Sequence, residues 1–361
     1  MKLMHIADLH LDAKMETGLT SARARERRVE LLMTFSRAID EAVALDVDAV
    51  LLAGDLFDTA RVTEKTRRYV GDIVCDHPSL RFFYVAGNHD ESVAPLFAGD
   101  TPPDNWTAFG ADGWDSVVID GVRVSGTSAI ARPGIYDELP TAASGEFHIV
   151  MLHGQVVRSG DGGGERIPLK QLQNRGIDYL ALGHEHAFRC EALDGRGLWA
   201  YAGCPEGRGF DECGEKGYIL LDTDAPAQAR VSFYPIAKRT LHLVEVDVTD
   251  CMSFGDIQER LLAAVEDIEA ADMVKAVLTG ALSPEVSYDT VHLAKLLGER
   301  FYFARLKDQT TLAIRPEDYA HDVSLKGEFI RTVMASRLSE QEKQRTILCG
   351  LRALRGEEVD V

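Results

Sequence analysis

Residues 81–90 read Arg81-Phe82-Phe83-Tyr84-Val85-Ala86-Gly87-Asn88-His89-Asp90, a short apolar run that changes abruptly into a polar cluster. An apolar run without polar alternation is typical of a strand that is covered on both faces. In open α/β sheets, active sites lie just beyond the carboxyl ends of such strands. The stretch therefore predicts an α/β fold with functional side chains at the end of a buried strand.

The same pattern recurs four more times within the first 240 residues. Residues 3–7 lead to Asp8-Leu9-His10, 49–53 to Gly54-Asp55, 149–152 to His153-Gly154, and 179–182 to Gly183-His184-Glu185-His186. Between the first two runs, apolar residues at 31, 35, 39 and 43 have helical spacing and predict a strand, helix, strand unit. Packing of these strands brings their polar ends onto one rim.

The later part of this region favours antiparallel strands. Asp120-Gly121 separates two apolar runs and predicts a hairpin, and residues 199–201, 218–221 and 231–234 are further strand candidates. We therefore expect a mixed α/β (α+β) fold, with a two-sheet β sandwich flanked by helices.

The pattern changes near residue 240, where the next strand candidate ends in no polar cluster. We expect three parts: 1–240, which holds all the polar strand ends, an α+β domain at 241–315, and C-terminal helices at 316–361. Helices are expected near 257–271 and 289–297, and Ser339 with Glu342 forms a capping-box pattern. The stripe Ile347, Leu351 and Leu354 either packs on its own domain or docks a partner.

Composition limits the classes of protein that the chain can belong to. It has 361 residues, 45% hydrophobic and 27% charged, with a formal net charge of −19 and six cysteines without a Cys-x-x-Cys pair. No apolar stretch approaches the roughly 20 residues that span a bilayer, and charge at the N-terminus interrupts any signal-peptide core. We expect a cytoplasmic globular protein with no membrane partner, in which any nucleic-acid site is local because the whole chain repels polyanions.

The polar strand ends offer carboxylate, amide and imidazole groups together. The candidate metal ligands are Asp8, His10, Asp55, Asn88, His153, His184 and His186. This mixture suits divalent ions such as Mn2+, Fe2+ or Zn2+, whereas Mg2+ and Ca2+ normally recruit oxygen alone. Seven ligands exceed the need of one ion, so Asp55 is expected to bridge two ions about 3.5 to 4 Å apart.

The ordered set resembles the calcineurin-like metallophosphoesterases. Their pattern Asp-x-His, Gly-Asp, Gly-Asn-His-Asp, His-Gly, Gly-His-x-His occurs here over about residues 1–240. The resemblance implies that Asp8, His10 and His186 hold one ion, that Asn88, His153 and His184 hold the other, and that Asp55 lies between them. It also implies that His89 acts on the leaving oxygen as the catalytic histidine, with Asp90 orienting it.

Within that superfamily, the chain is most similar to the nuclease subunit of bacterial SbcCD and its double-strand-break repair counterparts. The similar segments are residues 5–12, 47–50, 53–58, 179–184, 201–203 and 214–217. More narrowly, residues 205–208 and 212–217 are similar to a bacterial DNA-repair-exonuclease subgroup. This resemblance implies a DNA substrate, a capping domain and an SMC-like coiled-coil ATPase partner. Two residues depart from it: Asp58 stands where several relatives have histidine, and Cys204 where relatives have Ser or Asn.

Two basic clusters follow the first two polar strand ends and are candidates for contacting substrate. They are Arg23, Arg25, Arg27 and Arg28, and Arg61, Lys65, Arg67 and Arg68. Either they contact phosphate, or they form a solvated face with Glu26 and Glu30 as partners. No sequence-specific DNA-binding motif accompanies them, so recognition would be directed at the backbone.

These observations predict a metal-dependent DNA nuclease, exonuclease or endonuclease, that uses two Mn2+ ions, with Fe2+ or Zn2+ as alternatives, and acts with an SMC-like ATPase in DNA repair. A first alternative is a phosphodiesterase for nucleotides or other small molecules, which the acidic charge favours. A second is a non-catalytic scaffold for an ATPase. Whether the chain forms a homodimer is left open.

Overall fold

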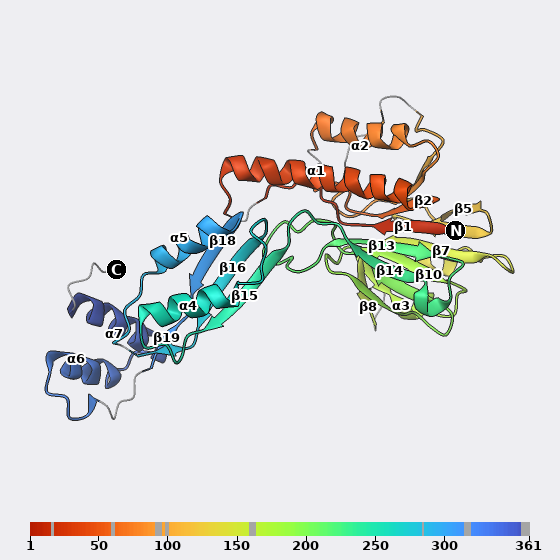
Figure 1. The fold of residues 1–361 in the computed structure, drawn as a ribbon. Helices are drawn as coiled ribbons and strands as arrows, with labels where there is room; N and C mark the ends of the chain where they lie inside the picture. The colour runs from red at the N-terminus through yellow and green to blue at the C-terminus, as the bar shows by residue number, and fades with distance from the viewer. Residues whose placement is uncertain are drawn as a thin grey trace. The chain divides into compact units, whose positions relative to one another are not determined.

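The computed structural model describes residues 1–15, 18–58, 62–90, 96–97, 101–158, 164–283, 285–313 and 319–354. The chain divides into two compact units, Met1–Thr240 and Leu241–Val361 (Figure 1). Among the described residues, no helix is long and apolar enough to cross a membrane.

The first unit contains two six-stranded sheets. One has the order β14-β13-β1-β2-β3-β4, and the other β11-β12-β10-β7-β6-β5. The first comprises β1 (Lys2–Ile6), β2 (Ala49–Ala53), β3 (Arg81–Val85), β4 (Trp106–Phe109), β13 (Gly217–Asp222) and β14 (Val231–Pro235). The second comprises β5 (Asp115–Ile119), β6 (Val122–Gly126), β7 (Phe147–His153), β10 (Tyr179–Gly183), β11 (Arg189–Ala192) and β12 (Leu198–Tyr201). The expected mixed sandwich is confirmed.

The pairing of the later strands follows the sequence-based expectation only in part. β13 and β14 are antiparallel to their neighbours, and β5 and β6 form the hairpin around Asp120-Gly121. β12 instead pairs in parallel with β10. β11 is antiparallel to β12 and lies beside it in the sheet, so the short β11–β12 hairpin returns the chain in the direction of β10.

Each face of both sheets is covered, which explains the unalternated apolar runs. Leu3, Leu51 and Phe83 of the first sheet pack against Ile149 and Tyr179 of the second in one buried cluster. Helices α1 (Ser21–Ala44) and α2 (Glu64–Asp76) cover the outer face of the first sheet (Figure 1). The outer face of the second is covered by η1 (Ile135–Glu138) and α3 (Leu169–Leu172). Two short strands, β8 (Gln155–Val157) and β9 (Arg166–Pro168), and η2 (Ala227–Ala229) complete the unit.

Helix α1 begins where Thr20 accepts a hydrogen bond from the main-chain N–H of Arg23. Of its expected apolar stripe, Leu31, Phe35 and Ile39 are buried. Val43, near the end of the helix, is instead half exposed.

The second unit is built on a parallel sheet of β15 (Leu241–Asp247), β16 (Met273–Thr279) and β18 (Phe303–Asp308). Helices α4 (Phe254–Ala264) and α5 (Thr290–Arg300) pack on one face of this sheet, and β17 (Ala281–Leu282) pairs with β19 (Thr311–Leu312). The helix expected at 257–271 is thus shorter and begins earlier, because Ser253 and Asp256 form a capping box that starts it.

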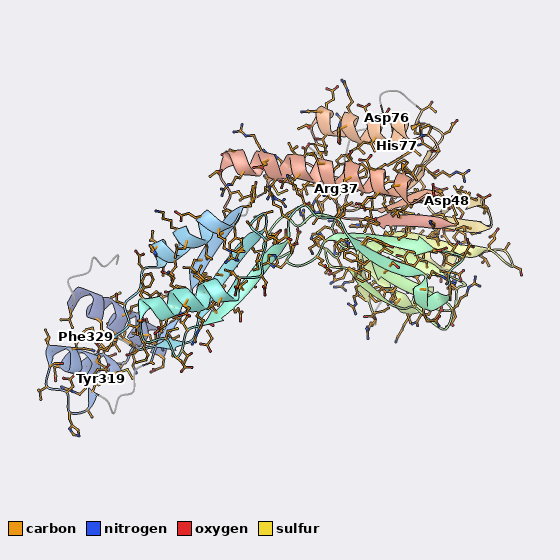
Figure 2. The ribbon with its side chains drawn as sticks, viewed as in Figure 1. Arg37, Asp48, Asp76, His77, Tyr319 and Phe329 are labelled. Carbon is orange, nitrogen blue, oxygen red and sulfur yellow. The ribbon has the colours of Figure 1, made fainter. Side chains whose placement is uncertain are left out.

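Helices α6 (Leu325–Met334) and α7 (Glu340–Leu354) pack against each other at the end of the described chain. The Ser339–Glu342 capping box is present at the start of α7. Ile347 and Leu351 are buried against α6, whereas Leu354 is exposed. A side chain at Gly350 would overlap the ring of Phe329, so the glycine permits the close approach of the two helices (Figure 2). Most of the predicted stripe therefore packs within its own unit.

Candidate metal centre

The polar clusters that follow five strands meet at one rim of the first unit. Asp8 and His10 follow β1, Asp55 follows β2, and Asn88 follows β3. His153 ends β7 of the other sheet, and His184 and His186 follow β10. Main-chain hydrogen bonds from Asp8 N to the Gly54 carbonyl (3.1 Å) and from His10 N to the Asp55 carbonyl (2.9 Å) tie the first two loops together. The rim therefore joins side chains from both sheets.

Backbone strain is concentrated at these strand ends. Asp8, His10, Asp55 and His184 have φ values of 53°, 42°, 50° and 106°, in a region that residues other than glycine rarely adopt. Such conformations cost about 1–3 kcal/mol each and persist where the surroundings hold them. A side chain at Gly87 would overlap the Asp55 carboxylate, so glycine is required there. These backbone conformations direct side chains that follow separate strands toward one small region.

Asp8, His10 and His186 form the first tight group. Each offers a ligand atom within 4.8 Å of the others, and the two Nε2 atoms of the histidines lie 3.2 Å apart. Nδ1 of His186 faces Glu212 Oε1 at 2.8 Å. Because a carboxylate accepts the proton at Nδ1, the Nε2 lone pair of His186 is directed toward His10 and is available as a ligand.

Asp8, Asp55 and His153 form the second tight group. Nε2 of His153 lies 3.3 Å from Asp55 Oδ2 and 3.1 Å from Asn88 Oδ1. Nδ1 of His153 donates to the Ala53 carbonyl at 2.9 Å. This hydrogen bond fixes the tautomer and presents Nε2 to the rim.

His184 belongs to neither tight group and lies beside the second one. Its ring centroid is 5.4 Å from that of His153, and its Nδ1 is 4.0 Å from Glu165 Oε2. Its main-chain N–H donates to Asp8 Oδ1 at 2.8 Å. The structure brings five of the seven predicted ligands into the two groups, with Asn88 bonded to His153 and His184 beside its ring.

Asp8 and Asp55 have opposite electrostatic environments. Burial raises the pKa of Asp8 to about 7. Burial also acts to raise the pKa of Asp55, but the hydrogen bond and charge of His153 outweigh it and hold that pKa at about 2. Although burial opposes protonation of His153, the carboxylates of Asp55 and Asp8 raise its pKa to about 9. A site that draws a proton onto a buried histidine in this way favours positive charge.

These residues fit a divalent cation. Asp8 and Asp55 are buried, and neither makes a salt bridge to lysine or arginine in the described part of the chain. Buried carboxylates without such a partner are strongly disfavoured unless a cation or protons compensate them. Mixed carboxylate, amide and neutral imidazole donors are those that Mn2+, Fe2+ and Zn2+ accept.

His89 stands at the exposed mouth of this centre. Its Nδ1 lies 2.6 Å from the Asp58 carbonyl oxygen, which can only accept, so Nδ1 donates and Nε2 remains available. Its ring centroid is 5.0 Å from that of His10. A group bound at the rim can therefore contact Nε2 of His89.

The expected role of Asp90 as the residue that orients His89 is wrong. The buried carboxylate of Asp90 accepts the main-chain N–H groups of Leu56, Phe57 and Gly87 at 2.9–3.1 Å, with no bond to His89. These amides belong to the loops that carry Asp55 and Asn88. Asp90 thus holds two ligand loops together, and the Asp58 carbonyl orients His89.

Arg208 and Glu212 are parts of the site that the strand-end pattern did not predict. Glu212 contacts His186, and Arg208 contacts both Glu212 and Asp58. Cys204 is buried beside them, with its Sγ 3.9 Å from Glu212 Oε2. They lie several residues beyond the end of β12, so the rule that found the other candidates passed over them. The available signal was that residues 205–208 and 212–217 resemble segments of related nucleases.

The first basic cluster is divided by the structure. Arg23 and Arg25 are exposed and Arg28 is half buried, all on the first two turns of α1. Arg27 is only 1% exposed, and its guanidinium contacts Glu30, Glu206 and the Gly207 carbonyl. The prediction that Arg27 contacts substrate is therefore wrong, because its side chain points from α1 into the protein interior and binds these groups there.

Arg27→Met is expected to destabilise the fold by about 3–5 kcal/mol, because it leaves Glu30 and Glu206 buried with one cation fewer. Arg239 and Lys238 still contact Glu30 and keep the loss from being larger. Urea unfolding followed by circular dichroism measures the change. Arg25→Met, which removes an exposed arginine on the same helix, should shift stability by less than about 0.5 kcal/mol, and equal effects of the two variants would contradict the assignment.

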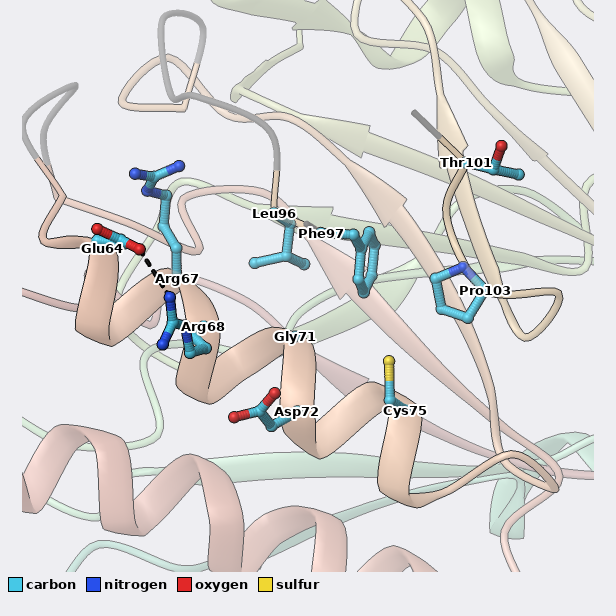
Figure 3. Close-up of a pocket in the computed structure, with 10 residues that line it drawn as sticks. All are labelled: Glu64, Arg67, Arg68, Gly71, Asp72, Cys75, Leu96, Phe97, Thr101 and Pro103. Carbon is cyan, nitrogen blue, oxygen red and sulfur yellow. Dashed lines mark hydrogen bonds and ion pairs between the residues drawn. The ribbon is translucent and has the colours of Figure 1, made fainter. Parts of the chain in front are cut away.

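The second basic cluster lies along the start of α2. Arg61 lies outside the described residues, and Lys65 is exposed. Arg68 pairs with Glu64 at 2.7 Å, and both arginines at 67 and 68 line a pocket with Leu96, Phe97 and Pro103 (Figure 3). That pocket contains none of the metal-ligand candidates.

Comparison with known proteins agrees with this geometry. Residues 1–188, just over half of the chain, match the family model for the calcineurin-like phosphoesterase. The chain is 28% identical over 243 residues to the uncharacterized metallophosphoesterase YhaO of Bacillus subtilis, covering 61% of this chain and 57% of that protein. It is 29% identical over 242 residues to the DNA double-strand break repair protein Mre11 of Sulfolobus acidocaldarius, covering 62% and 60%. The match thus spans less than two thirds of these relatives' length.

Among solved structures, a dimetal phosphatase from Danio rerio is similar with a TM-score of 0.40 at 12% identity, covering 61% of this chain and 91% of that one. The family match includes the strand ends after β1, β2, β3, β7 and β10 that supply the rim. The chain belongs to the calcineurin-like phosphoesterase family.

Proposed function

We propose that this chain is a two-metal phosphodiesterase that hydrolyses DNA. The observation that carries the proposal is the convergence of Asp8, His10, Asp55, His153 and His186 into two ligand groups that share Asp8 and surround Asp55. Such paired groups suit two ions that share a carboxylate, the arrangement used for in-line displacement at phosphorus.

The proposed ligands divide between two ion positions. Asp8, His10 and His186 would hold one ion, Asn88, His153 and His184 the other, and Asp55 would contact both. Two divalent ions held there would neutralise the negative charge of the phosphoryl oxygens. They would also lower the pKa of a bound water molecule, so that it could act as the nucleophile. Mn2+ is the proposed ion, with Fe2+ and Zn2+ as alternatives that the same donors accept.

The chain's own residues supply positioning and proton transfer. His89 Nε2 is exposed at the mouth, where it can donate a hydrogen bond or a proton to the leaving oxygen. The Asp58 carbonyl fixes the orientation of the His89 ring for this role. Asp90 holds the loops that carry Asp55 and Asn88 together through hydrogen bonds to their main-chain amides. These contacts position His89 and the ligand loops before substrate binds.

DNA is proposed as the substrate because relatives such as those of Sulfolobus acidocaldarius and Haloferax volcanii are named as DNA double-strand break repair proteins. Arg23, Arg25 and Arg28, near the start of α1, are proposed phosphate contacts. The net charge of −19 instead favours the alternative substrate, a nucleotide or another small phosphodiester, because an acidic chain repels a polyanion.

An SMC-like ATPase partner is proposed from the sequence resemblance. Leu348 and Leu354 of α7 remain exposed and are candidates for contacting it. In the scaffold alternative the same contact would be the main role of the chain, and the metal centre would be dispensable.

The test is hydrolysis of end-labelled linear duplex DNA and circular single-stranded DNA by the purified chain with Mn2+. We expect cutting that EDTA abolishes and that added Mn2+ restores. If both DNAs stay intact while bis-p-nitrophenyl phosphate is hydrolysed, the small-substrate alternative replaces DNA. If neither substrate is cut, the scaffold alternative is favoured.

A further inference from the structure

The segment from Cys204 to Lys216 holds His186 from behind, although it contains no proposed metal ligand. Nδ1 of His186 lies 2.8 Å from Glu212 Oε1 and 3.2 Å from Nη2 of Arg208. The main-chain carbonyl of His186 accepts hydrogen bonds from Lys216 Nζ at 2.7 Å and from Cys204 Sγ at 3.6 Å. One segment thus fixes both the ring and the main chain of this histidine.

Arg208 links His186 to His10 through two carboxylates. Its Nη1 donates to Asp58 Oδ1 at 3.1 Å, while Nε and Nη2 donate to Glu212 Oε1 at 3.1 and 2.6 Å. Asp58 Oδ1 lies 3.3 Å from Nδ1 of His10. The guanidinium therefore joins two carboxylates, each of which faces the rear nitrogen of one histidine of the first tight group.

Among the described residues, the histidines of the other proposed ion position have no carboxylate that an arginine holds behind them. Nδ1 of His153 donates to a main-chain carbonyl, that of Ala53. Nδ1 of His184 is 4.0 Å from Glu165, whose side chain is half exposed. Within the described part of the chain, one of the two positions has both of its histidines backed by carboxylates that a single arginine contacts, and the other position does not.

We propose that Arg208 is a positioning residue: through Asp58 and Glu212 it holds His10 and His186 in ligand geometry and makes their ion position the tighter of the two. The inference rests on the proposed function, because it takes these histidines as metal ligands. Partners behind a ligand orient its ring and raise its basicity, and their loss typically costs about 10- to 100-fold in metal affinity. A lysine cannot replace the planar fork, since its single ammonium cannot span both carboxylates.

The direction in which metal affinity changes when Arg208 is replaced distinguishes a positioning role from a purely electrostatic one. Arg208 is itself a cation near the ion position, so charge repulsion alone predicts that its removal tightens metal binding. Positioning predicts the opposite, since His10 and His186 lose their fixed orientation. Arg208→Lys adds a second criterion, because it preserves the charge and removes the fork.

The experiment measures Mn2+ binding to the full chain by titration calorimetry and electron paramagnetic resonance. The native chain is compared with Arg208→Met, Arg208→Lys and Glu212→Gln. Arg196→Met is the matched control, because Arg196 also forms a two-bond pair, with Asp178 at 2.8 and 2.6 Å, at the opposite ends of the strands. Melting temperatures in EDTA measure any general loss of fold.

We expect two Mn2+ ions to bind the native chain with unequal affinities. Arg208→Met should weaken the tighter one by about 10- to 100-fold, Arg208→Lys should reproduce most of that loss, and Glu212→Gln should act in the same direction. The affinity of the weaker position should not change in these variants, and Arg196→Met should bind both ions as the native chain does.

Native-like or tighter Mn2+ binding by Arg208→Met overturns this inference but leaves the proposed function standing. Native-like binding by Arg208→Lys does the same. An equal loss at both positions, with a lower melting temperature in EDTA, assigns Arg208 a structural role and also overturns it. A native chain that binds no Mn2+ overturns the proposed function as well.

Discussion

Asp55→Asn is expected to lower DNA hydrolysis by about 10³-fold or more. The proposed ions supply several kcal/mol of transition-state charge stabilisation, and about 4 kcal/mol corresponds to a factor of 10³. Asp55 lies between a histidine of each group, with its Oδ2 3.6 Å from His10 Nε2 and 3.3 Å from His153 Nε2. Loss of its charge should therefore weaken both positions together. Initial rates of cutting at saturating Mn2+ measure the effect.

The same variant should lose stabilisation by metal. At Mn2+ concentrations 100-fold above the dissociation constant, each bound ion stabilises the native chain by about 2.7 kcal/mol, which a melting curve with and without Mn2+ detects. Asp40→Asn, which removes an exposed carboxylate from α1, is the control and should retain both activity and the Mn2+-induced shift. An Asp55→Asn chain that keeps both would contradict the placement of the ions.

His89→Ala is expected to lower the rate of hydrolysis by about 10²- to 10⁴-fold while both ions remain bound. The reason is that His89 is exposed and lies outside both groups that contain Asp8, although it could form a further ligand group with His10 and Asp58. Single-turnover rates on duplex DNA, with Mn2+ stoichiometry measured in parallel, separate catalysis from metal binding. The loss should be smaller for a phosphodiester with a good leaving group, because such a group needs no proton.

His77→Ala is the matched control, because Nδ1 of His77 likewise lies near a main-chain carbonyl, that of Ile73, at 2.7 Å. His77 lies at the carboxyl end of α2 (Figure 2), and its replacement should leave the rate unchanged. If His89→Ala hydrolyses DNA at the native rate, His89 has no part in the chemistry. If it loses its metal ions, His89 is a ligand rather than an acid.

The strand-end rule succeeded because it depends only on local chemistry. A buried parallel strand is recognisable by its apolar residues, and the polar residue after it must lie at the sheet edge. This placed Asp8, Asp55 and His153 on one rim although they come from two sheets. The rule could not foresee that β12 would run parallel to β10, because pairing direction depends on how the chain returns through β11.

The errors concern residues whose partners are distant in sequence. Arg27 was assigned to a solvent-facing cluster, but Glu206, 179 positions later, turns it into a buried ion pair. Asp90 was assigned to its neighbour His89, whereas its partners are main-chain amides more than 30 residues earlier and at Gly87. Arg208 and Glu212 become part of the site only through the folding of their segment behind His186. Spacing along the chain cannot supply contacts of this kind.

The most direct test of the account is anomalous diffraction from crystals of the native chain grown with Mn2+. We predict two anomalous peaks, about 3.5 to 4 Å apart, on either side of the Asp55 carboxylate, one near His10 and His186 and the other near His153 and Asn88. The absence of Mn2+ from this rim, or a single ion that His153 and His186 do not contact, would contradict the central claim that the ends of five strands build one two-metal centre.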